Sequence, residues 1–562
     1  MKKIFALVFI LFFLVGCSHW LIKKEPHIPR RKGVQIPEEA GEYPKVHEKD
    51  ILRGTLSPFR SCYDVSSYDL SVELNIKEKS IMGKCQMYAI ALNDFDTLQI
   101  DLFANMEIAS IEKNDKDLSF YRQHNSVFIE IPKMIKDELF EISIEYKGVP
   151  IEAKNPPWDG GFIWDEDKNG TPLIGVACEG IGASLWWPNK DHPSDEPDSI
   201  SLSITVPDTL LAIGNGRLDS IKKHDSTATY TWLVKNPINN YNITINIGDY
   251  VEILDTLINS FGEHKLNHYV LSYNEETAIQ YFPQAREVIH FFEKVFGEYP
   301  FWEDGYKLVE APYAGMEHQS SIAYGNDYIT SGHYYMYDLV DYIILHETAH
   351  EWWGNSLTAC DGADIWLHES FATYSEVLFI EEKLGRLVSI DYLKKKRPYI
   401  SNKLPMVGPR NVNYWGFDDV YWKGAWVLHT LRSVINNDDV FFKFIKESQI
   451  HFRHSIVCSE EFIKFIEQNV NMDLDYFFKQ YLFDRKPPVF EYHQDDSTLH
   501  YKWSGVHDEF IMPMDVMINK KLVRLFPTPN DQTIKIAKHS LIEVLDKEFY
   551  IKKILISEED WP

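Results

Sequence analysis

Cysteine is scarce in this sequence, with 6 residues in a chain of 562. One cysteine lies near the N-terminus, and the others are widely spaced at Cys62, Cys85, Cys178, Cys360 and Cys458. Small secreted domains that depend on a dense disulfide framework have far more cysteine, so that class is excluded. The widely spaced set is odd in number, and we therefore expect at least one free, buried thiol without predicting any pairing.

Basic residues are in the minority: Lys and Arg number 57 against 84 Asp and Glu, which gives a net charge of -27. Such a surface repels phosphate groups, and we expect no nucleic acid as a partner. The acidity favours cationic ligands or serves solubility alone, and composition does not choose between the two. Hydrophobic residues make up 44% and aromatic residues 14% of the chain, enough apolar surface for several globular domains at this length.

The N-terminal apolar run, residues 4–15, is too short for a permanent membrane-spanning helix. It follows two lysines, as in an export signal. Its end, "LVGC", resembles the lipobox of bacterial lipoproteins, in which cleavage exposes a cysteine that becomes acylated. We expect residues 1–17 to be a lipoprotein signal peptide and Cys17 to anchor the protein to a lipid membrane, an ordinary secretory signal being the alternative. The protein would then be extracytoplasmic. Ser18, the residue after the lipobox cysteine, resembles the residue type that directs lipoproteins to the bacterial outer membrane, so we expect the protein on the periplasmic or surface face of that membrane.

The remaining chain divides by pattern into four parts. Residues 18–50 hold prolines among charges with little periodicity, which predicts an extended tether. Short alternating runs predict a β-rich domain over 51–254. Apolar residues three and four apart, clearest after Glu275, predict a mainly helical domain over 255–485. Alternation returns over 486–562, where we expect a small β-sandwich, so the fold class is α+β and multidomain.

The segment "HETAH" carries His346 and His350 four residues apart, on one face of a predicted helix, where both imidazoles can reach one cation. A catalytic zinc needs a third protein ligand and one open position. Glu369 follows His350 after 18 intervening residues, on the next predicted helix. We expect one zinc ion held by His346, His350 and Glu369. The alternative is a surface helix with incidental polar residues, but the neighbouring tryptophan pair marks this helix as buried, and buried His and Glu need partners.

This combination of H-E-x-x-H, 18 residues and Glu resembles the aminopeptidase N family of zinc metallopeptidases, the gluzincins. The resemblance extends over most of the chain. It implies a saddle-like N-terminal β domain, a thermolysin-like and mainly helical catalytic domain, and a small C-terminal β-sandwich. By this resemblance we expect no counterpart of the large C-terminal helical domain that covers the site in many relatives, and therefore a more open cleft.

Glu347 is the expected general base, which takes a proton from the attacking water and is no metal ligand. In "DDVYWKGAWVLHTLR" the chain resembles the family's Tyr-x-Lys-Gly segment, whose tyrosine stabilises the oxyanion; this implies that role for Tyr421, a core tyrosine being the alternative. Trp422 stands where relatives often have an acidic residue.

Three further polar residues are candidates for supporting the metal ligands or the loops beside them. Glu376 lies seven residues after Glu369, near two turns along the same helix face, and is a candidate for a hydrogen bond to a ligand histidine; a solvated glutamate is the alternative. Asp364 is a second candidate for a hydrogen bond to a ligand histidine, and a solvated carboxylate is again the alternative. Asn355 matches the family's W-x-G-N segment, which implies a capping or loop-fixing role.

The stretch "APYAGMEHQSS" resembles the family's G-x-M-E-N segment, in which the glutamate binds the α-ammonium group of the substrate. The resemblance implies a substrate-binding role for Ala314, Gly315, Met316 and Glu317. Ala314 and His318 depart from the family's residues. Glu179 matches a Glu or Gln of the family's β domain that lines the site for the first residue, so two carboxylates would bracket the ammonium; a plain surface glutamate is the alternative.

We therefore expect a zinc-dependent aminopeptidase that removes N-terminal residues from peptides with a free N-terminus, by attack of a zinc-bound water. One alternative is a catalytically silent protein that binds peptide termini, which the changes at Ala314 and His318 motivate and the intact Glu347 opposes. The other is an endopeptidase with relaxed recognition of the peptide end.

Overall fold

The computed structural model describes residues 45–328, 339–414 and 419–557, together with 559 and 561. The predicted signal peptide, the lipid anchor Cys17 and most of the predicted tether lie outside these residues. The described chain starts with two short helices, α1 (Glu48–Gly54) and α2 (Pro58–Ser61), so the end of the predicted tether is helical. Within the described ranges, no helix combines the length and the apolar character needed to cross a membrane.

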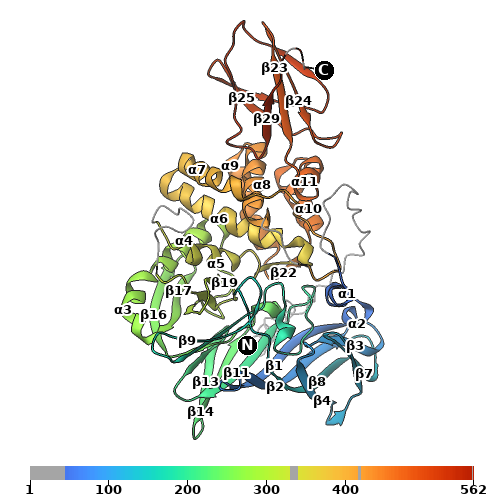
Figure 1. The fold of residues 1–562 in the computed structure, drawn as a ribbon, viewed down its shortest axis with the longest axis vertical. Coiled ribbons are helices and arrows are strands. Elements are labelled where there is room, and N and C mark those ends of the chain that lie inside the picture. The colour runs from blue at the N-terminus through green and yellow to red at the C-terminus, as the bar shows by residue number, and fades with distance from the viewer. Residues whose placement is uncertain (1–44, 329–338, 415–418, 558, 560, 562) are drawn as a thin grey trace, which may run out of the picture. The chain divides into compact units, whose positions relative to one another are not determined.

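The N-terminal β domain is built on an eight-stranded sheet with the order β13-β14-β11-β1-β2-β8-β4-β5 (Figure 1). Its strands are β1 (Tyr63–Asn75), β2 (Ser80–Ala91), β4 (Met106–Lys113), β5 (Lys116–Asp117), β8 (Leu139–Gly148), β11 (Ser199–Pro207), β13 (Arg217–Lys223) and β14 (Thr227–Val234). In β1, buried Leu70 and Val72 alternate with exposed Ser71 and Glu73, the period of a strand with one face on the core.

Two smaller sheets complete this domain, in the orders β3-β7-β6 and β12-β15-β10-β9. Their strands are β3 (Phe95–Asp101), β6 (Phe120–Gln123), β7 (Ser126–Met134), β9 (Gly161–Glu166), β10 (Pro172–Ala177), β12 (Leu211–Ile213) and β15 (Asn246–Gly248). Glu179 follows the end of β10 by two residues. The 3-10 turn η2 (Asn240–Asn242), just before β15, carries Tyr241. Both residues therefore lie on segments that flank strands of one sheet.

A five-stranded sheet with the order β16-β17-β18-β20-β19 leads into the helical domain. It contains β16 (Tyr250–Asn259), β17 (Gly262–Leu271), β18 (Leu308–Glu310), β19 (Gly315–Met316) and β20 (Ile322–Tyr324). The boundary predicted between residues 254 and 255 falls inside β16, because this strand alternates like those of the preceding domain. The edge strand β19 pairs antiparallel with β20 and ends at Met316, so it places Glu317 directly after a strand.

The helices of the predicted helical domain begin close to where the sequence pattern changes. They are α3 (Glu275–Tyr281), α4 (Gln284–Phe296), α5 (Tyr342–His350), α6 (Trp366–Leu384), α7 (Arg386–Lys396), α8 (Asp419–Ile435), α9 (Asp438–His451), α10 (Ser459–Val470) and α11 (Asp475–Leu482). Two short parallel strands, β21 (Leu357–Ala359) and β22 (Ser455–Val457), lie between them. A disulfide between Cys360 and Cys458 joins the chain directly after these two strands. The expectation of free, buried thiols is confirmed by Cys62, Cys85 and Cys178.

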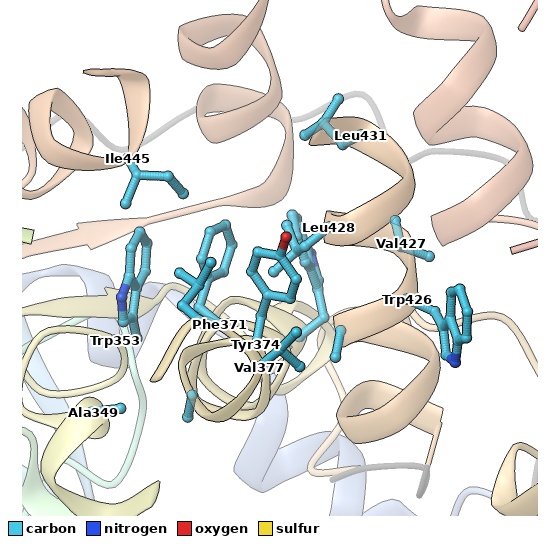
Figure 2. Packing of buried hydrophobic residues seen from close by; sticks show 14 of the residues in the cluster. Ala349, Trp353, Phe371, Tyr374, Val377, Trp426, Val427, Leu428, Leu431 and Ile445 are labelled. Atoms are coloured by element: carbon cyan, nitrogen blue, oxygen red, sulfur yellow. The ribbon is translucent and has the colours of Figure 1, made fainter. Parts of the chain in front are cut away.

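Helix α6 is the centre of the helical core, since every residue from 366 to 380 is buried. Figure 2 shows Phe371, Tyr374 and Val377 of α6 packed between Trp353 and helix α8. The Trp353 and Phe371 rings stack with their centroids 3.9 Å apart. Gly424 of α8 lies so close to α6 that a Cβ there would be 1.9 Å from the Ser370 hydroxyl. This close approach brings α8 onto the helix turn that carries Glu369.

The C-terminal strands form two sheets, with the orders β27-β24-β23-β29 and β26-β25-β28. The strands are β23 (Val489–Gln494), β24 (Thr498–Ser504), β25 (Met514–Ile518), β26 (Lys521–Leu525), β27 (Gln532–Lys535), β28 (Ile542–Val544) and β29 (Lys552–Leu555). Buried residues of both sheets, including Phe490, Trp503 and Val516, belong to the same hydrophobic core as the helices. The predicted α+β order, a β-rich part followed by helices and then by strands, is confirmed.

Candidate metal centre and active site

Helix α5 is fixed at its start by Asp341, whose carboxylate caps the helix by accepting a hydrogen bond from the Ile343 amide. The same carboxylate accepts hydrogen bonds from the hydroxyls of Tyr281 (2.7 Å) and Tyr324 (2.9 Å). Tyr324 belongs to β20, so these contacts tie the helix to the five-stranded sheet. From Ile343 onward α5 is buried, including the whole H-E-x-x-H segment.

The two histidines of α5 and Glu369 of α6 converge on one point. The Nε2 atoms of His346 and His350 lie 3.2 Å apart, and Glu369 Oε2 lies 3.5 Å from each of these nitrogens. This oxygen is buried and has no hydrogen-bond partner among the residues that the structure describes. A buried carboxylate oxygen facing two imidazole nitrogens needs a cation, and two nitrogens with one oxygen are the donor set of a catalytic zinc site. His346, His350 and Glu369 therefore fit a zinc ion.

Each histidine is oriented through its other ring nitrogen. His346 Nδ1 lies 2.8 Å from Glu376 Oε1, and His350 Nδ1 lies 2.9 Å from the Trp353 carbonyl. Both oxygens are acceptors, so both Nδ1 atoms carry the proton and both Nε2 lone pairs face the ligand position. The fully buried Glu376 thus makes the contact that its spacing from Glu369 predicts.

Asp364, the other carboxylate considered for this role, lies elsewhere, and that expectation is wrong. Both of its oxygens contact the Arg410 guanidinium, and Oδ1 accepts a hydrogen bond from the Ser459 amide at 3.2 Å. Asp364 belongs to the 3-10 turn η4 (Gly362–Asp364), which precedes α6, so it does not share the helix face of Glu369.

Glu347 lies between the metal ligands and the edge strand β19. A Cβ on Gly315 would lie 2.7 Å from Glu347 Oε1, so only glycine leaves room for this carboxylate. Burial raises the pKa of Glu347 to about 7, against the opposing effect of the two neighbouring imidazoles. The ligand atoms of Glu317, Glu347 and His350 all lie within 4.8 Å of one another.

Tyr421 of α8 is half-buried beside the metal ligands. Its hydroxyl donates a hydrogen bond to Glu369 Oε1 at 3.0 Å, and its ring stacks on His346 with centroids 6.2 Å apart. Burial, reinforced by nearby Glu369, raises its pKa well above the usual value, so it remains a donor. The lysine of the same segment, Lys423, points the other way and donates to the carbonyl of Arg485 at 3.0 Å.

Glu317 is buried at the end of β19 and held from two directions. Tyr241 of the β domain donates its hydroxyl proton to Glu317 Oε1 at 3.1 Å. Asn355 donates to the Glu317 carbonyl at 2.8 Å and accepts a hydrogen bond from the Asn242 side chain at 2.5 Å. Asn355 therefore links the loop after α5 to the segment that carries Glu317. The contact from Tyr241 was not predicted, because no sequence spacing relates this residue to Glu317.

The loop after Glu317 is tied to both domains. The Ser320 amide donates a hydrogen bond to Oε1 of Glu351, the residue directly after helix α5, at 2.8 Å. Lys307 donates to the Ser320 carbonyl at 2.9 Å, and Asn215 of the β domain donates to the Gln319 carbonyl at 2.8 Å. Glu351 was also missed, although its position next to His350 in a buried helix was a usable signal.

Glu179, two residues after the end of β10, lies near the same group of residues. Burial raises its pKa well above the usual value, and the nearby charges of Glu317, Glu369 and Glu347 act in the same direction. Such a cluster of carboxylates is unfavourable unless a cation joins it. The structure thus brings both predicted amine-binding glutamates together beside the metal ligands.

The two departures from the family segment have different surroundings. Ala314 is partly exposed, and its carbonyl accepts a hydrogen bond from the Gly325 amide at 2.9 Å. His318 is fully buried, and neither ring nitrogen has a hydrogen-bond partner in the described chain. Burial lowers the pKa of His318 to about 3. His318 therefore adds no positive charge beside Glu317 near neutral pH.

Comparison with known protein families matches two models to this chain. The peptidase M1 N-terminal domain matches residues 65–241, and the peptidase family M1 domain matches residues 281–481. The second match contains every metal-ligand candidate. Together the two matches span the β domain and the helical domain described above.

Curated relatives are named as aminopeptidases. Probable aminopeptidase 2 of Sulfurisphaera tokodaii is 21% identical over 83% of this chain and 60% of its own length. Probable aminopeptidase 1 of Saccharolobus solfataricus is 24% identical over 67% of this chain and 48% of its own. The chain thus spans about half the length of these relatives.

Solved structures share the fold. An M1 zinc metallopeptidase from Deinococcus radiodurans superposes with a TM-score of 0.66 at 19% identity, over 76% of this chain and 94% of that one. A mutant of the same enzyme bound to a Tyr-Ser-Ala substrate gives a TM-score of 0.63 at 20% identity, over 76% and 95% of the two chains.

Proposed function

The chain belongs to peptidase family M1, and on that premise we propose that it is a zinc-dependent aminopeptidase that hydrolyses the first peptide bond of peptides with a free N-terminus. One observation carries the proposal: Glu317, Glu347 and His350 offer ligand atoms within 4.8 Å of one another. An ammonium group bound by Glu317 is therefore about one residue away from a carbonyl group at the metal centre. That distance favours cleavage after the first residue.

His346, His350 and Glu369 would hold the zinc ion. When bound, the ion supplies a Lewis acid that polarises the scissile carbonyl and makes a nearby water easier to deprotonate. Glu347 accepts the proton of the attacking water and delivers it to the leaving amine, a transfer that its raised pKa suits. Tyr421 stays protonated, and its hydroxyl would turn from Glu369 Oε1 to donate its one proton to the oxyanion of the tetrahedral intermediate.

Glu317 and Glu179 receive the α-ammonium group of the substrate. A charge-assisted contact between carboxylate and ammonium is strong in a dehydrated cleft. An internal or acetylated peptide offers no cation, so binding it would leave both carboxylates buried and unpaired. This argument favours an aminopeptidase over an endopeptidase.

The same proposal extends to location. Cys17 would be acylated, so that the enzyme acts on peptides outside the cytoplasm, joined to the bacterial outer membrane by the tether. The support is the N-terminal sequence pattern alone. Cys17→Ala should move the protein from the membrane fraction to the soluble fraction, and an unchanged membrane fraction would contradict the anchor.

Activity is tested with a panel of aminoacyl-fluorophore substrates, each with a free and an N-acetylated amino group. The free substrates should be cleaved and the acetylated ones hardly at all. Equal rates on both would favour the endopeptidase alternative. Zinc-loaded protein that binds peptides with a free N-terminus and releases no product from any substrate would favour the silent binding protein.

A further inference from the structure

Trp422, the departure inside the Tyr-x-Lys-Gly segment, takes part in a buried arrangement behind the metal centre. The Lys396 ammonium lies 4.6 Å from the centroid of the Trp422 ring and 5.4 Å from that of the Tyr392 ring. The two rings meet edge to face at 6.1 Å. Lys396 is only 3% exposed, so an enclosed cation and two aromatic rings hold one another in place.

Tyr392 connects this cluster to the metal ligands. Its hydroxyl donates a hydrogen bond to Glu376 Oε2, while Oε1 of the same carboxylate lies 2.8 Å from His346 Nδ1. Tyr392 and Glu376 are both fully buried. The contacts thus run from α7 through α6 to the ligand histidine of α5.

The tyrosine hydroxyl restricts what Glu376 can do. A carboxylate that makes a single hydrogen bond can rotate about its terminal bond, whereas one held at both oxygens has a fixed plane. A fixed plane aligns the oxygen that accepts the His346 proton, and this sets the direction of the Nε2 lone pair. Burial lowers the pKa of Lys396 to about 8, and nearby Glu376 opposes this shift.

We propose that Tyr392 is a positioning residue of the metal centre: it fixes the Glu376 carboxylate and thereby the orientation of His346, and Lys396 and Trp422 fix the tyrosine ring. This inference rests on the zinc site of the proposed function. Trp422 thus has a role in positioning the metal centre, although it takes no part in the catalytic reaction.

The test compares Tyr392→Phe with Tyr374→Phe. Tyr374 is also buried and lies on α6, and its hydroxyl lies 3.3 Å from His429, a residue outside the metal centre. Tyr374→Phe therefore removes a buried hydroxyl that does not contact the metal ligands. Zinc affinity is measured by chelator competition on metal-free protein, and the ligand field by the absorption spectrum of the cobalt(II) form. Tyr392→Phe should weaken zinc binding by a factor of a few and shift the cobalt bands, less than the roughly 10- to 100-fold loss typical when the residue hydrogen-bonded to a metal ligand, here Glu376, is itself removed. Tyr374→Phe should change neither.

Two further variants keep the test decisive if Tyr392→Phe folds poorly. Trp422→Leu, at a half-buried position, should weaken zinc binding in the same direction by a smaller factor. In a Glu376→Ala background, Tyr392→Phe should have no further effect, because the two residues act through one contact. Additive losses, or equal affinities for Tyr392→Phe and the wild type, would overturn the inference alone. A wild-type chain with no zinc affinity would overturn the proposed function as well.

Discussion

His346, His350 and Glu369 lie on two consecutive helices, whereas Glu317 follows the edge strand of one sheet and Glu179 follows the end of a strand in another. The metal ligands are supported by neighbours on adjacent helices, such as Glu376. Of the two proposed amine-binding carboxylates, Glu317 is held by a contact from the β domain.

This difference separates two kinds of dependence. Helix geometry brings the two histidines together, and Glu369 and Glu376 come from the adjacent helix α6, so the metal side is built within the helical domain. On the amine side, Glu317 is held by Tyr241, and its loop by Asn215 and Glu351. Substitutions on the metal side should therefore remove the chemistry, and substitutions on the amine side should change which peptides are used.

The largest effect is expected for Glu369→Ala. Loss of the third ligand removes the Lewis acid, which contributes several kcal/mol, so kcat/KM should fall about 10³-fold or more. The variant should also lose the rise in melting temperature that added zinc gives the wild type. Glu382→Ala, an exposed change on the same helix that breaks a pair with Lys294, is the control and should behave like the wild type. A Glu369→Ala enzyme with wild-type kcat/KM would contradict the ligand assignment.

Glu347→Gln should separate chemistry from metal binding. The change removes the proton acceptor and keeps the side-chain volume, so kcat should fall by roughly 10²- to 10⁴-fold. Zinc affinity should remain that of the wild type, because Glu347 is not among the three converging ligands. Zinc affinity is measured by chelator competition and kcat with an aminoacyl-fluorophore substrate. Loss of zinc in step with kcat would make Glu347 a ligand instead of a base.

On the amine side, Glu317→Gln should act on KM more than on kcat. A hydrogen bond to a charged group contributes about 1.5–3 kcal/mol, which corresponds to a rise in KM of roughly 10- to 100-fold. Glu179→Gln should raise KM less, since Glu317 remains to bind the ammonium group. Both variants are compared with the wild type on free and N-acetylated substrates. The preference for the free amino group should shrink in each, and an unchanged preference would remove these residues from the amine site.

The smallest effect is expected for His318→Asn and concerns stability. The pKa of His318 falls from 6.5 to about 3 on folding, so below the higher value the unfolded chain binds the proton and the folded chain does not. The wild type should therefore lose up to about 2 kcal/mol of its free energy of unfolding between about pH 8 and about pH 5 through this residue.

The asparagine variant lacks this contribution. Denaturant unfolding of both proteins at the two pH values should show a smaller loss for His318→Asn than for the wild type. Equal losses would mean that His318 is not held in its neutral form.

The sequence predicted the metal side well because helical spacing is local. The spacing of His346, His350 and Glu369 places them on facing helix turns, and the seven-residue step to Glu376 gives its contact with His346. Helical spacing failed for Asp364, because this residue belongs to a 3-10 turn and not to the helix that carries Glu369.

The amine side could be predicted only in part. The resemblance indicated Glu317 and Glu179, but Tyr241 and Lys307 reach this loop through tertiary contacts that no spacing encodes. The burial of His318 could not be predicted either, because the residues that surround it come together only in the folded protein. Strand alternation likewise continued past the predicted domain boundary, which therefore fell inside β16.

The most direct test is a zinc-edge anomalous diffraction map from a crystal soaked in a free amino acid. We expect one anomalous peak between His346 Nε2, His350 Nε2 and Glu369 Oε2, with the ammonium group of the amino acid against Glu317. Absence of a peak at that point, or an amino acid bound with its ammonium group away from Glu317, would contradict this expectation.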